Sequence, residues 1–120
     1  MKKVFVSGGS GYIAMYCIKI LLEKGYNVVT SVREESQIDL VKKSLLKHNV
    51  AFENLNFTIL DLLKDEGWDD ALNGCEYVLH VASPVIPGDV DEDSLVKPAV
   101  EGMTRCLNAA IKNGAKKFVQ

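Results

Sequence analysis

The chain has no excess of charge of either sign. Lys and Arg together number 14 and Asp and Glu 16, which leaves a formal net charge of −2 over 120 residues. A protein that binds nucleic acid through its phosphates needs clustered Lys and Arg. The composition therefore gives no support to a nucleic-acid partner.

Long hydrophobic runs are also absent. No apolar stretch approaches the roughly 20 residues that cross a bilayer. The apolar start at residues 4–6 is interrupted by Ser7, Gly8 and Gly9, well before it reaches the length of a signal-peptide core. We therefore expect a cytoplasmic chain without a membrane partner.

Cysteine is scarce, and its spacing excludes two classes of protein. Cys17, Cys75 and Cys106 are odd in number and form neither a CxxC pair nor a metal-ligand pattern. They indicate reduced, mostly buried thiols of an intracellular protein rather than a disulfide framework or a metal site. What is present, 48% hydrophobic and 25% charged residues, is typical of one globular domain.

Short apolar or β-branched runs alternate with helical patterns along the chain. The predicted strands cover residues 4–6, 27–32, 56–60, 77–82 and 117–119, and the predicted helices cover 13–24, 36–48, 69–72 and 95–111. Such alternation indicates right-handed βαβ crossovers, and hence a Rossmann-type, doubly wound parallel sheet with an uncompleted fifth strand. An α+β fold would group its strands instead.

The sequence also predicts where the last helix begins and which residues of the first two helices are buried. Residues 89–93 are expected to form a polar loop, and Pro98 is tolerable only in a first helical turn or at a kink. The expected buried face of the first helix comprises Ile13, Cys17, Ile20, Leu21 and Leu22, and that of the second comprises Ile38, Val41, Leu45 and Leu46.

A glycine-rich loop lies between the first strand and the first helix. Gly8, Gly11 and Ala14 form a G-x-x-G-x-x-A pattern, and Gly9, Gly11 and Ala14 also fit the dinucleotide fingerprint G-x-G-x-x-[GA]. Small residues there permit a tight turn, close approach of a pyrophosphate and close packing of helix on strand. A mere connecting turn is the alternative, and a P-loop is excluded because no Gly-Lys-Ser/Thr follows.

The end of the second strand indicates which dinucleotide binds. In NAD sites an acidic residue there takes the ribose hydroxyls, whereas an Arg accommodates the 2′-phosphate of NADP. Here Arg33 follows Val32, which favours NADP, although Glu34 leaves NAD open. Lys42 and Lys43 could add to a phosphate site, but lysines on a helix surface are usually just solvated.

Over all 120 residues the chain resembles the extended short-chain dehydrogenases/reductases, in the branch of dihydroflavonol, cinnamoyl-CoA and ketone/aldehyde reductases. The resemblance rests on residues 6–14, 32–33, 61–62, 80–84 and 97–102. Ala99 stands where sugar-nucleotide epimerases usually have Asn. The resemblance implies a strand order of 3-2-1-4-5, the cofactor NADP and a small carbonyl substrate.

The resemblance also implies a set of cofactor-binding residues. Asp61 would hydrogen-bond the adenine amino group beside the Leu62 backbone, and Val81, Ala82 and Ser83 would line the pyrophosphate and nicotinamide ribose. Asp61 could instead cap a turn, and Ser83 could simply end a strand. The full expected set is Gly8, Gly9, Ser10, Gly11, Tyr12, Ile13, Arg33, Asp61, Leu62, Val81, Ala82 and Ser83.

Catalytic residues of this family are not found in the chain. The family's Tyr-x-x-x-Lys pair is missing, since no tyrosine is followed by Lys four residues on, and His80 and His48 fit a packed core and a helix end. We therefore expect residues 1–120 to be a partial NADP-binding domain without its substrate domain, inactive alone and prone to self-association. The alternative is a non-catalytic NADP-binding redox sensor or partner module.

Overall fold

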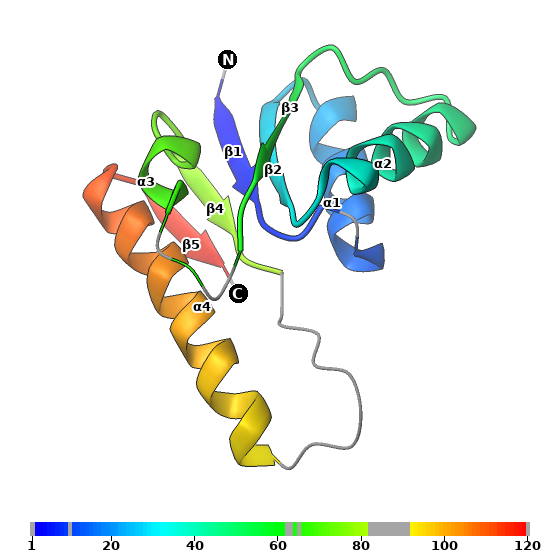
Figure 1. Ribbon diagram of the computed structural model, residues 1–120. Helices are drawn as coiled ribbons and strands as arrows, with labels where there is room; N and C mark the ends of the chain where they lie inside the picture. The colour runs from blue at the N-terminus through cyan, green and yellow to red at the C-terminus, as the bar shows by residue number, and fades with distance from the viewer. Residues whose placement is uncertain (1, 10, 62–63, 65, 82–91, 120) are drawn as a thin grey trace.

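Strands and helices alternate along the described part of the chain in a computed structural model (Figure 1). The structure describes residues 2–9, 11–61, 64, 66–81 and 92–119, with only the backbone described over 92–99. The elements are β1 (Lys3–Val6), α1 (Tyr12–Glu23), β2 (Asn27–Val32), α2 (Glu35–Lys47), β3 (Leu55–Ile59), α3 (Trp68–Ala71), β4 (Tyr77–Leu79), α4 (Glu92–Lys112) and β5 (Lys117–Val119).

The strands form one five-stranded parallel sheet with the order β3-β2-β1-β4-β5. The first strand lies at its centre, where Val6 is in register with Thr30 of β2 on one side and with Leu79 of β4 on the other. The strand order reverses between β1 and β4, which is the place where open α/β sheets bind their ligands. The predicted doubly wound fold and strand order are confirmed.

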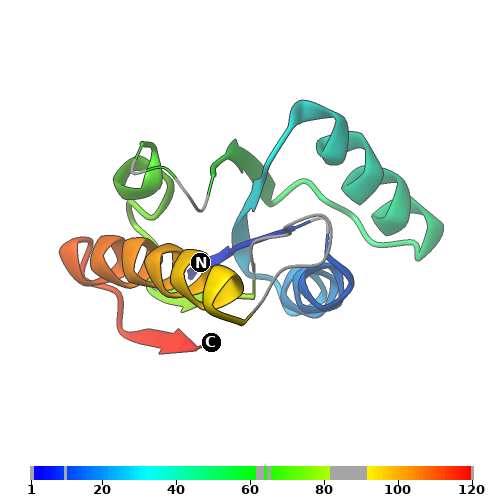
Figure 2. The ribbon, with the colours of Figure 1, turned by 60° about the horizontal axis from the view of Figure 1, so that its bottom comes forward.

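Each face of the sheet carries its own core, because successive side chains of a strand point to opposite faces. Val4 and Val6 pack with the residues of α1 and α2, whereas Phe5 packs with α3 and α4. The Phe5 ring meets Trp68 of α3 edge-on, with 6.3 Å between ring centroids. Figures 1 and 2 show α1 and α2 grouped on one side of the sheet and α3 and α4 on the other.

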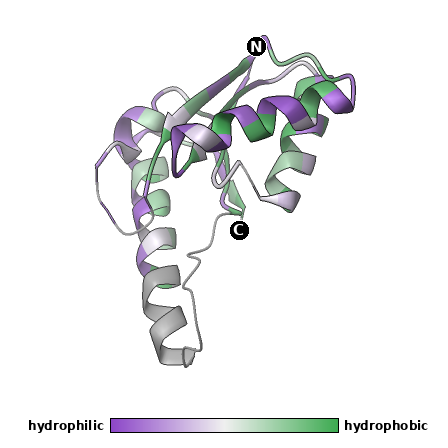
Figure 3. Cartoon of the chain, turned by 45° about the vertical axis from the view of Figure 1, so that its right-hand side comes forward, coloured by the Kyte–Doolittle hydropathy of each residue, from purple (hydrophilic) through white to green (hydrophobic). Residues whose placement is uncertain are grey.

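The expected buried face of α2 is confirmed except at Leu46, whereas the most buried residues of α1 lie one position beyond the expected Ile13 and Cys17. Ala14 and Ile18 are buried in α1, whereas Ile13 is 67% exposed. Along α2, where hydrophobic and hydrophilic residues alternate (Figure 3), Val41 and Leu45 are buried and Leu46 is 62% exposed. Adjacent apolar residues leave two faces available to a helix, and packing on the sheet selects one of them.

The last helix begins earlier than expected. Helix α4 starts at Glu92, so Glu92 and Asp93 are helical rather than part of a polar loop, while residues 89–91 lie outside the described residues. Acidic residues in a first turn are favoured by the helix dipole. Pro98 is consequently the seventh residue of α4 and lies beyond its first turn.

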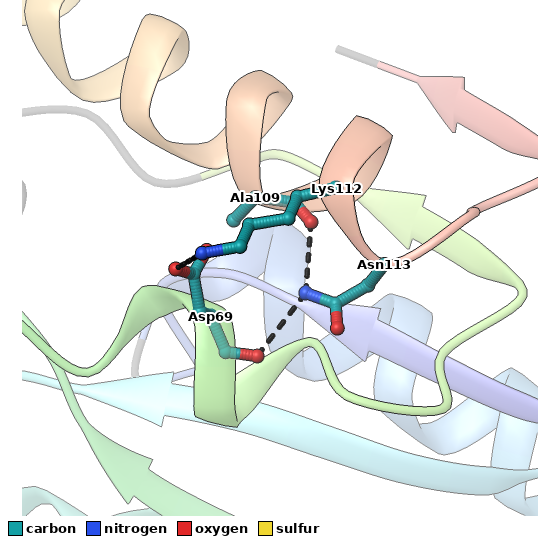
Figure 4. A network of polar contacts seen from close by, with 4 residues as sticks. All are labelled: Asp69, Ala109, Lys112 and Asn113. Carbon is teal, nitrogen blue, oxygen red and sulfur yellow. Dashed lines mark hydrogen bonds and ion pairs between the residues drawn. The ribbon is translucent and has the colours of Figure 1, made fainter.

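The end of α4 is joined to α3 by a small polar network (Figure 4). Lys112 Nζ lies 2.8 Å from the Asp69 carboxylate. The Asn113 amide donates to the carbonyl oxygens of Ala109, at 2.9 Å, and of Asp69, at 3.1 Å. The Ala109 carbonyl also accepts the Asn113 backbone N–H at 3.1 Å, so the Asn113 side chain links the last turn of α4 to the Asp69 carbonyl of α3.

Three further properties concern the described residues alone. Among them, no helix is long and apolar enough to cross a membrane, and no three His, Cys, Asp or Glu residues are grouped as metal ligands. The three cysteines are free thiols: Cys75 and Cys106 are buried and Cys17 is half-buried. Burial raises the pKa of the Cys106 thiol to about 12.

Candidate dinucleotide-binding site

The carboxyl edge of the sheet brings together residues that are far apart in the sequence. The glycine loop follows β1, Arg33 follows β2, Asp61 lies two residues beyond β3 and Val81 two residues beyond β4. Parallel strands all end at this edge, so the four segments are neighbours. Four residues of the expected set, Ser10, Leu62, Ala82 and Ser83, lie outside the described residues.

The glycine loop is a tight turn whose two ends bond to each other. Gly8 has a φ of 71°, in the left-handed region that favours glycine. Gly11 caps α1 from the extended region, with φ −75° and ψ 153°, and its N–H donates to the Gly8 carbonyl at 2.9 Å. A Cβ on Gly11 would have one close neighbour, the Gly8 oxygen at 3.3 Å.

The second strand braces this loop from the side. The Gly8 N–H donates to Ser31 Oγ at 2.9 Å and the Gly9 N–H to the Ser31 carbonyl at 2.7 Å. A Cβ on Gly9 would overlap Thr30 Oγ1, which itself donates to the Val6 carbonyl at 2.7 Å. Gly9 is therefore small because it packs against β2.

Thr30 and Ser31 support the glycine loop, a role that was not predicted from the sequence. Both are buried in a strand that is otherwise mostly valine. Buried hydroxyl groups need hydrogen-bond partners. Two consecutive hydroxyl residues in a buried parallel strand were the available signal.

Backbone donors for an anion remain at the start of α1. The N–H groups of Gly8, Gly9 and Gly11 already bond within the protein, whereas the first three N–H groups of a helix have no acceptor four residues back. Met15 N–H makes the first such bond, to Gly11 at 2.9 Å. Tyr12 and Ile13 are 87% and 67% exposed. Their N–H groups and the positive end of the helix dipole fit a pyrophosphate.

Ser7 joins the glycine loop to the end of β4. It is fully buried, and its N–H donates to the Leu79 carbonyl at 3.0 Å. Its Oγ accepts the Val81 N–H at 3.0 Å and lies 3.0 Å from His80 Nδ1. The contact fixes the position of Val81, one of the expected site residues, and this role of Ser7 was not predicted from the sequence.

His80 is the packed core residue that the sequence predicts. It is 4% exposed and its ring stacks on Phe118 of β5, with 6.2 Å between centroids. The backbone N–H of His80 donates to the Val119 carbonyl at 2.7 Å. Burial lowers the pKa of the imidazole below its ordinary value of 6.5, so the ring is neutral at pH 7.

The turn from β2 to α2 engages its glutamate and leaves its arginine exposed. Glu34 caps α2 in a reciprocal capping box with Gln37, and Ser36 Oγ donates to the Glu34 carboxylate at 3.4 Å. Gln37 Oε1 accepts the N–H groups of Arg33, at 2.7 Å, and of Glu34, at 3.3 Å. Arg33 is exposed beside this turn, at the carboxyl edge.

Lys42, Lys43 and Asp61 occupy different surroundings. Lys42 Nζ lies over the rings of Phe52 and Phe57, 6.0 and 5.9 Å from their centroids, so it packs against β3 and the loop before it. Lys43 is exposed. Asp61 is half-buried at the carboxyl edge beyond β3, and its carbonyl accepts the Lys64 N–H at 3.1 Å.

Known proteins resemble the chain over nearly its whole length. It is 39% identical over 116 residues to cinnamoyl-CoA reductase 1 of Petunia hybrida, covering 97% of the chain and 33% of that relative. It is 36% identical over 118 residues to tetraketide alpha-pyrone reductase 1 of Arabidopsis thaliana, covering 98% of the chain and 36% of that relative. The crystal structure of Gre2 from Candida albicans in complex with NADPH is similar with a TM-score of 0.76 and 31% identity, over 98% of this chain and 35% of that one.

These matches set both the family and the extent of the likeness. The chain spans about a third of the length of the curated relatives it matches. The resemblance to the reductase branch is confirmed, and the model of the NAD dependent epimerase/dehydratase family matches residues 4–120. The chain therefore belongs to the NAD dependent epimerase/dehydratase family, among relatives that are reductases.

Proposed function

We propose that residues 1–120 are the NADP-binding part of an NADPH-dependent oxidoreductase that acts on a small aldehyde or ketone. The observation that carries the proposal is the end of β2, where Arg33 is exposed while the Glu34 carboxylate caps α2. Arg binds phosphate through a planar fork of donors, whereas a free carboxylate would repel it. The reductase relatives and the NADPH complex of Gre2 support this reading.

The residues of the carboxyl edge divide the binding among them. The N–H groups of Tyr12 and Ile13 would bind the pyrophosphate, with Gly8, Gly9, Ser10 and Gly11 shaping its approach. Arg33 would bind the 2′-phosphate. Asp61 and Leu62 would meet the adenine, and Val81, Ala82 and Ser83 the nicotinamide half. When bound, the cofactor would supply the hydride, and the proton donor would come from outside residues 1–120.

The test is the relative affinity for the two nicotinamide cofactors. Isothermal titration should show that NADP(H) binds more tightly than NAD(H), and Arg33→Ala should remove most of the difference. Loss of a hydrogen bond to a charged group costs about 1.5–3 kcal/mol, which corresponds to roughly 10- to 150-fold in affinity for NADP(H). Lys47→Ala, an exposed cation at the far end of α2, serves as the control and should change neither affinity. Equal affinities of the unaltered chain for the two cofactors would contradict the Arg33 assignment.

A further inference from the structure

The β2–α2 turn places next to each other two side chains that favour different cofactors, one NADP and the other NAD. Arg33 suits a 2′-phosphate, whereas Glu34, if free, would suit the hydroxyls of an unphosphorylated ribose. Both residues are exposed and both lie at the carboxyl edge of the sheet. The cofactor preference therefore depends on which of the two side chains is free to reach that edge.

A single side chain bonds to the backbone of both residues. Gln37 Oε1 accepts the Arg33 N–H at 2.7 Å and the Glu34 N–H at 3.3 Å, from one turn further along. In this capping box the Gln37 backbone N–H faces the Glu34 side chain and donates to the Glu34 carbonyl oxygen at 3.1 Å. Ser36 Oγ, 3.4 Å from Glu34 Oε2, adds a donor to the same carboxylate.

This network binds the glutamate and leaves the arginine side chain outside it. A carboxylate at a helix N-terminus is stabilised by the backbone N–H groups and by the helix dipole, so leaving it has a cost. By accepting the backbone N–H groups of Arg33 and Glu34, Gln37 restricts the backbone conformation of the turn that holds this carboxylate. Removing the Gln37 amide would let Glu34 leave the helix end and reach the edge of the sheet.

We propose that Gln37 is a positioning residue for cofactor specificity, which keeps Glu34 on the helix and leaves Arg33 to meet the 2′-phosphate. The proposal rests on the proposed function, since it presupposes that a nicotinamide dinucleotide binds at this edge. It adds that the preference depends on the capping network as well as on Arg33.

The experiment is a double-mutant cycle read by isothermal titration with NADP(H) and NAD(H). Gln37→Met, which keeps the side-chain length but removes the acceptor, should weaken NADP(H), strengthen NAD(H) and lower their affinity ratio by about tenfold. In Glu34→Gln the cap can persist without a charge. In the double variant with Glu34→Gln, Gln37→Met should therefore no longer weaken NADP(H) binding while strengthening NAD(H) binding.

Further variants separate positioning from damage to the helix. Gln37→Glu keeps an acceptor oxygen, and Glu serves as well as Gln at this position of a capping box, so the order of preference should be retained. Asp39→Asn, an exposed change on the same helix, is the matched control and should leave the ratio unchanged. Ser36→Ala should shift the ratio in the same direction as Gln37→Met by a smaller factor, and it decides the matter if Gln37→Met does not fold.

Three outcomes would overturn the inference, and one of them also removes its basis. If Gln37→Met weakens the binding of both cofactors by the same factor, Gln37 does not act through Glu34. The same conclusion follows if its opposite effects on the two affinities persist in the presence of Glu34→Gln. In both cases the proposed function still holds. If the unaltered chain binds neither dinucleotide, both proposals fail together. Circular dichroism of each variant ensures that only folded protein is compared.

Discussion

At the scale of single residues, two glycines of one motif, Gly9 and Gly11, have different structural roles. Gly9 is buried with no room for a Cβ beside Thr30, whereas Gly11 is exposed in a backbone conformation that any residue adopts. The sequence motif alone does not distinguish these roles. Substitutions distinguish them, because a side chain at Gly9 should affect stability and one at Gly11 should affect cofactor binding.

Replacing Gly9 should destabilise the protein. In Gly9→Ala the new methyl group overlaps Thr30 Oγ1, and overpacking of this kind costs about 1–3 kcal/mol of unfolding free energy. Thermal unfolding measures the loss. The double variant with Thr30→Ala should lose less than the sum of the two single changes, since the second change makes room for the first. Additive losses would show that the contact is not the cause.

Replacing Gly11 should instead abolish cofactor binding and spare the fold. The side chain of Gly11→Val would occupy the pyrophosphate's approach to the first turn of α1. Its Cβ meets only the Gly8 oxygen, at 3.3 Å, so a small shift accommodates it. Titration with NADP(H) should show no binding while the far-UV circular dichroism spectrum stays close to that of the unaltered chain. Retained binding would mean that the loop is only a connector.

The buried imidazole of His80 should make the fold sensitive to acid. Because its pKa lies below the ordinary 6.5, the unfolded chain takes up a proton first as the pH falls. The stability that the neutral ring contributes is complete above about pH 6.5 and is lost progressively below it. The unfolding midpoint, measured from pH 8 to pH 5, should therefore fall at the acid end.

Two histidine variants test the origin of this acid sensitivity. His80→Phe should flatten the profile, although at pH 7.5 it is less stable because Ser7 loses a hydrogen-bond partner, at a cost of about 1 kcal/mol. His48→Asn, a change at the exposed end of α2, should keep the full acid dependence. An unchanged profile in His80→Phe would place the sensitivity in another group.

At the scale of elements, β5 is the strand with the least support. It has three residues, pairs with β4 alone at the edge of the sheet, and ends with Val119, which is 52% exposed. Open edges of sheets are templates for pairing with another chain. The half-buried Phe118, stacked on His80, nevertheless ties this strand to the core.

Self-association through this edge is the expected consequence. Light scattering or sedimentation should detect species larger than the monomer whose population increases with protein concentration. Val119→Lys should reduce it, because a charge on an edge strand discourages pairing. A matched change on β3, the opposite edge, is Ile59→Lys, where the side chain is 49% exposed. A greater effect of Ile59→Lys would assign the association to that edge.

At the scale of the whole molecule, binding and chemistry are expected to separate. The carboxyl edge of residues 1–120 supplies the candidate groups for a dinucleotide, while the sequence contains no Tyr-x-x-x-Lys pair to deliver a proton to a carbonyl oxygen. Without a positioned proton donor, a carbonyl remains unactivated towards hydride. Binding without turnover is therefore the expected behaviour of this chain.

The absence of turnover is directly measurable. A purified chain whose mass corresponds to residues 1–120 should bind NADPH and show no oxidation of it at 340 nm with aldehyde or ketone substrates. The protein encoded by the uninterrupted reading frame, assayed in parallel, is the comparison that separates a reductase from a non-catalytic module. Turnover by residues 1–120 alone would require a proton donor other than a Tyr-x-x-x-Lys pair, and would contradict this prediction.

Much of the fold follows from local properties of the sequence. Strand and helix alternate because β-branched runs and helical periodicity are written into consecutive residues, and Gly8 marks its turn because that backbone needs a positive φ. Arg33 after the second strand is local in the same sense. Boundaries differ by a few residues, the buried face of α1 is offset by one position, and Leu46 of α2 is exposed, since the sequence offers two adjacent apolar faces.

What the tertiary structure alone decided is which polar groups already have partners. Ser7 meets His80 across 73 residues of sequence because the register of β1 and β4, with Val6 opposite Leu79, continues one residue further. The packing of Gly9 on Thr30 likewise depends on the pairing of β1 with β2. These contacts join the loop glycines' N–H groups to acceptors within the protein, whereas the first N–H groups of α1 have no acceptor four residues back. Strand register is a property of the assembled sheet, and a single strand read alone does not contain it.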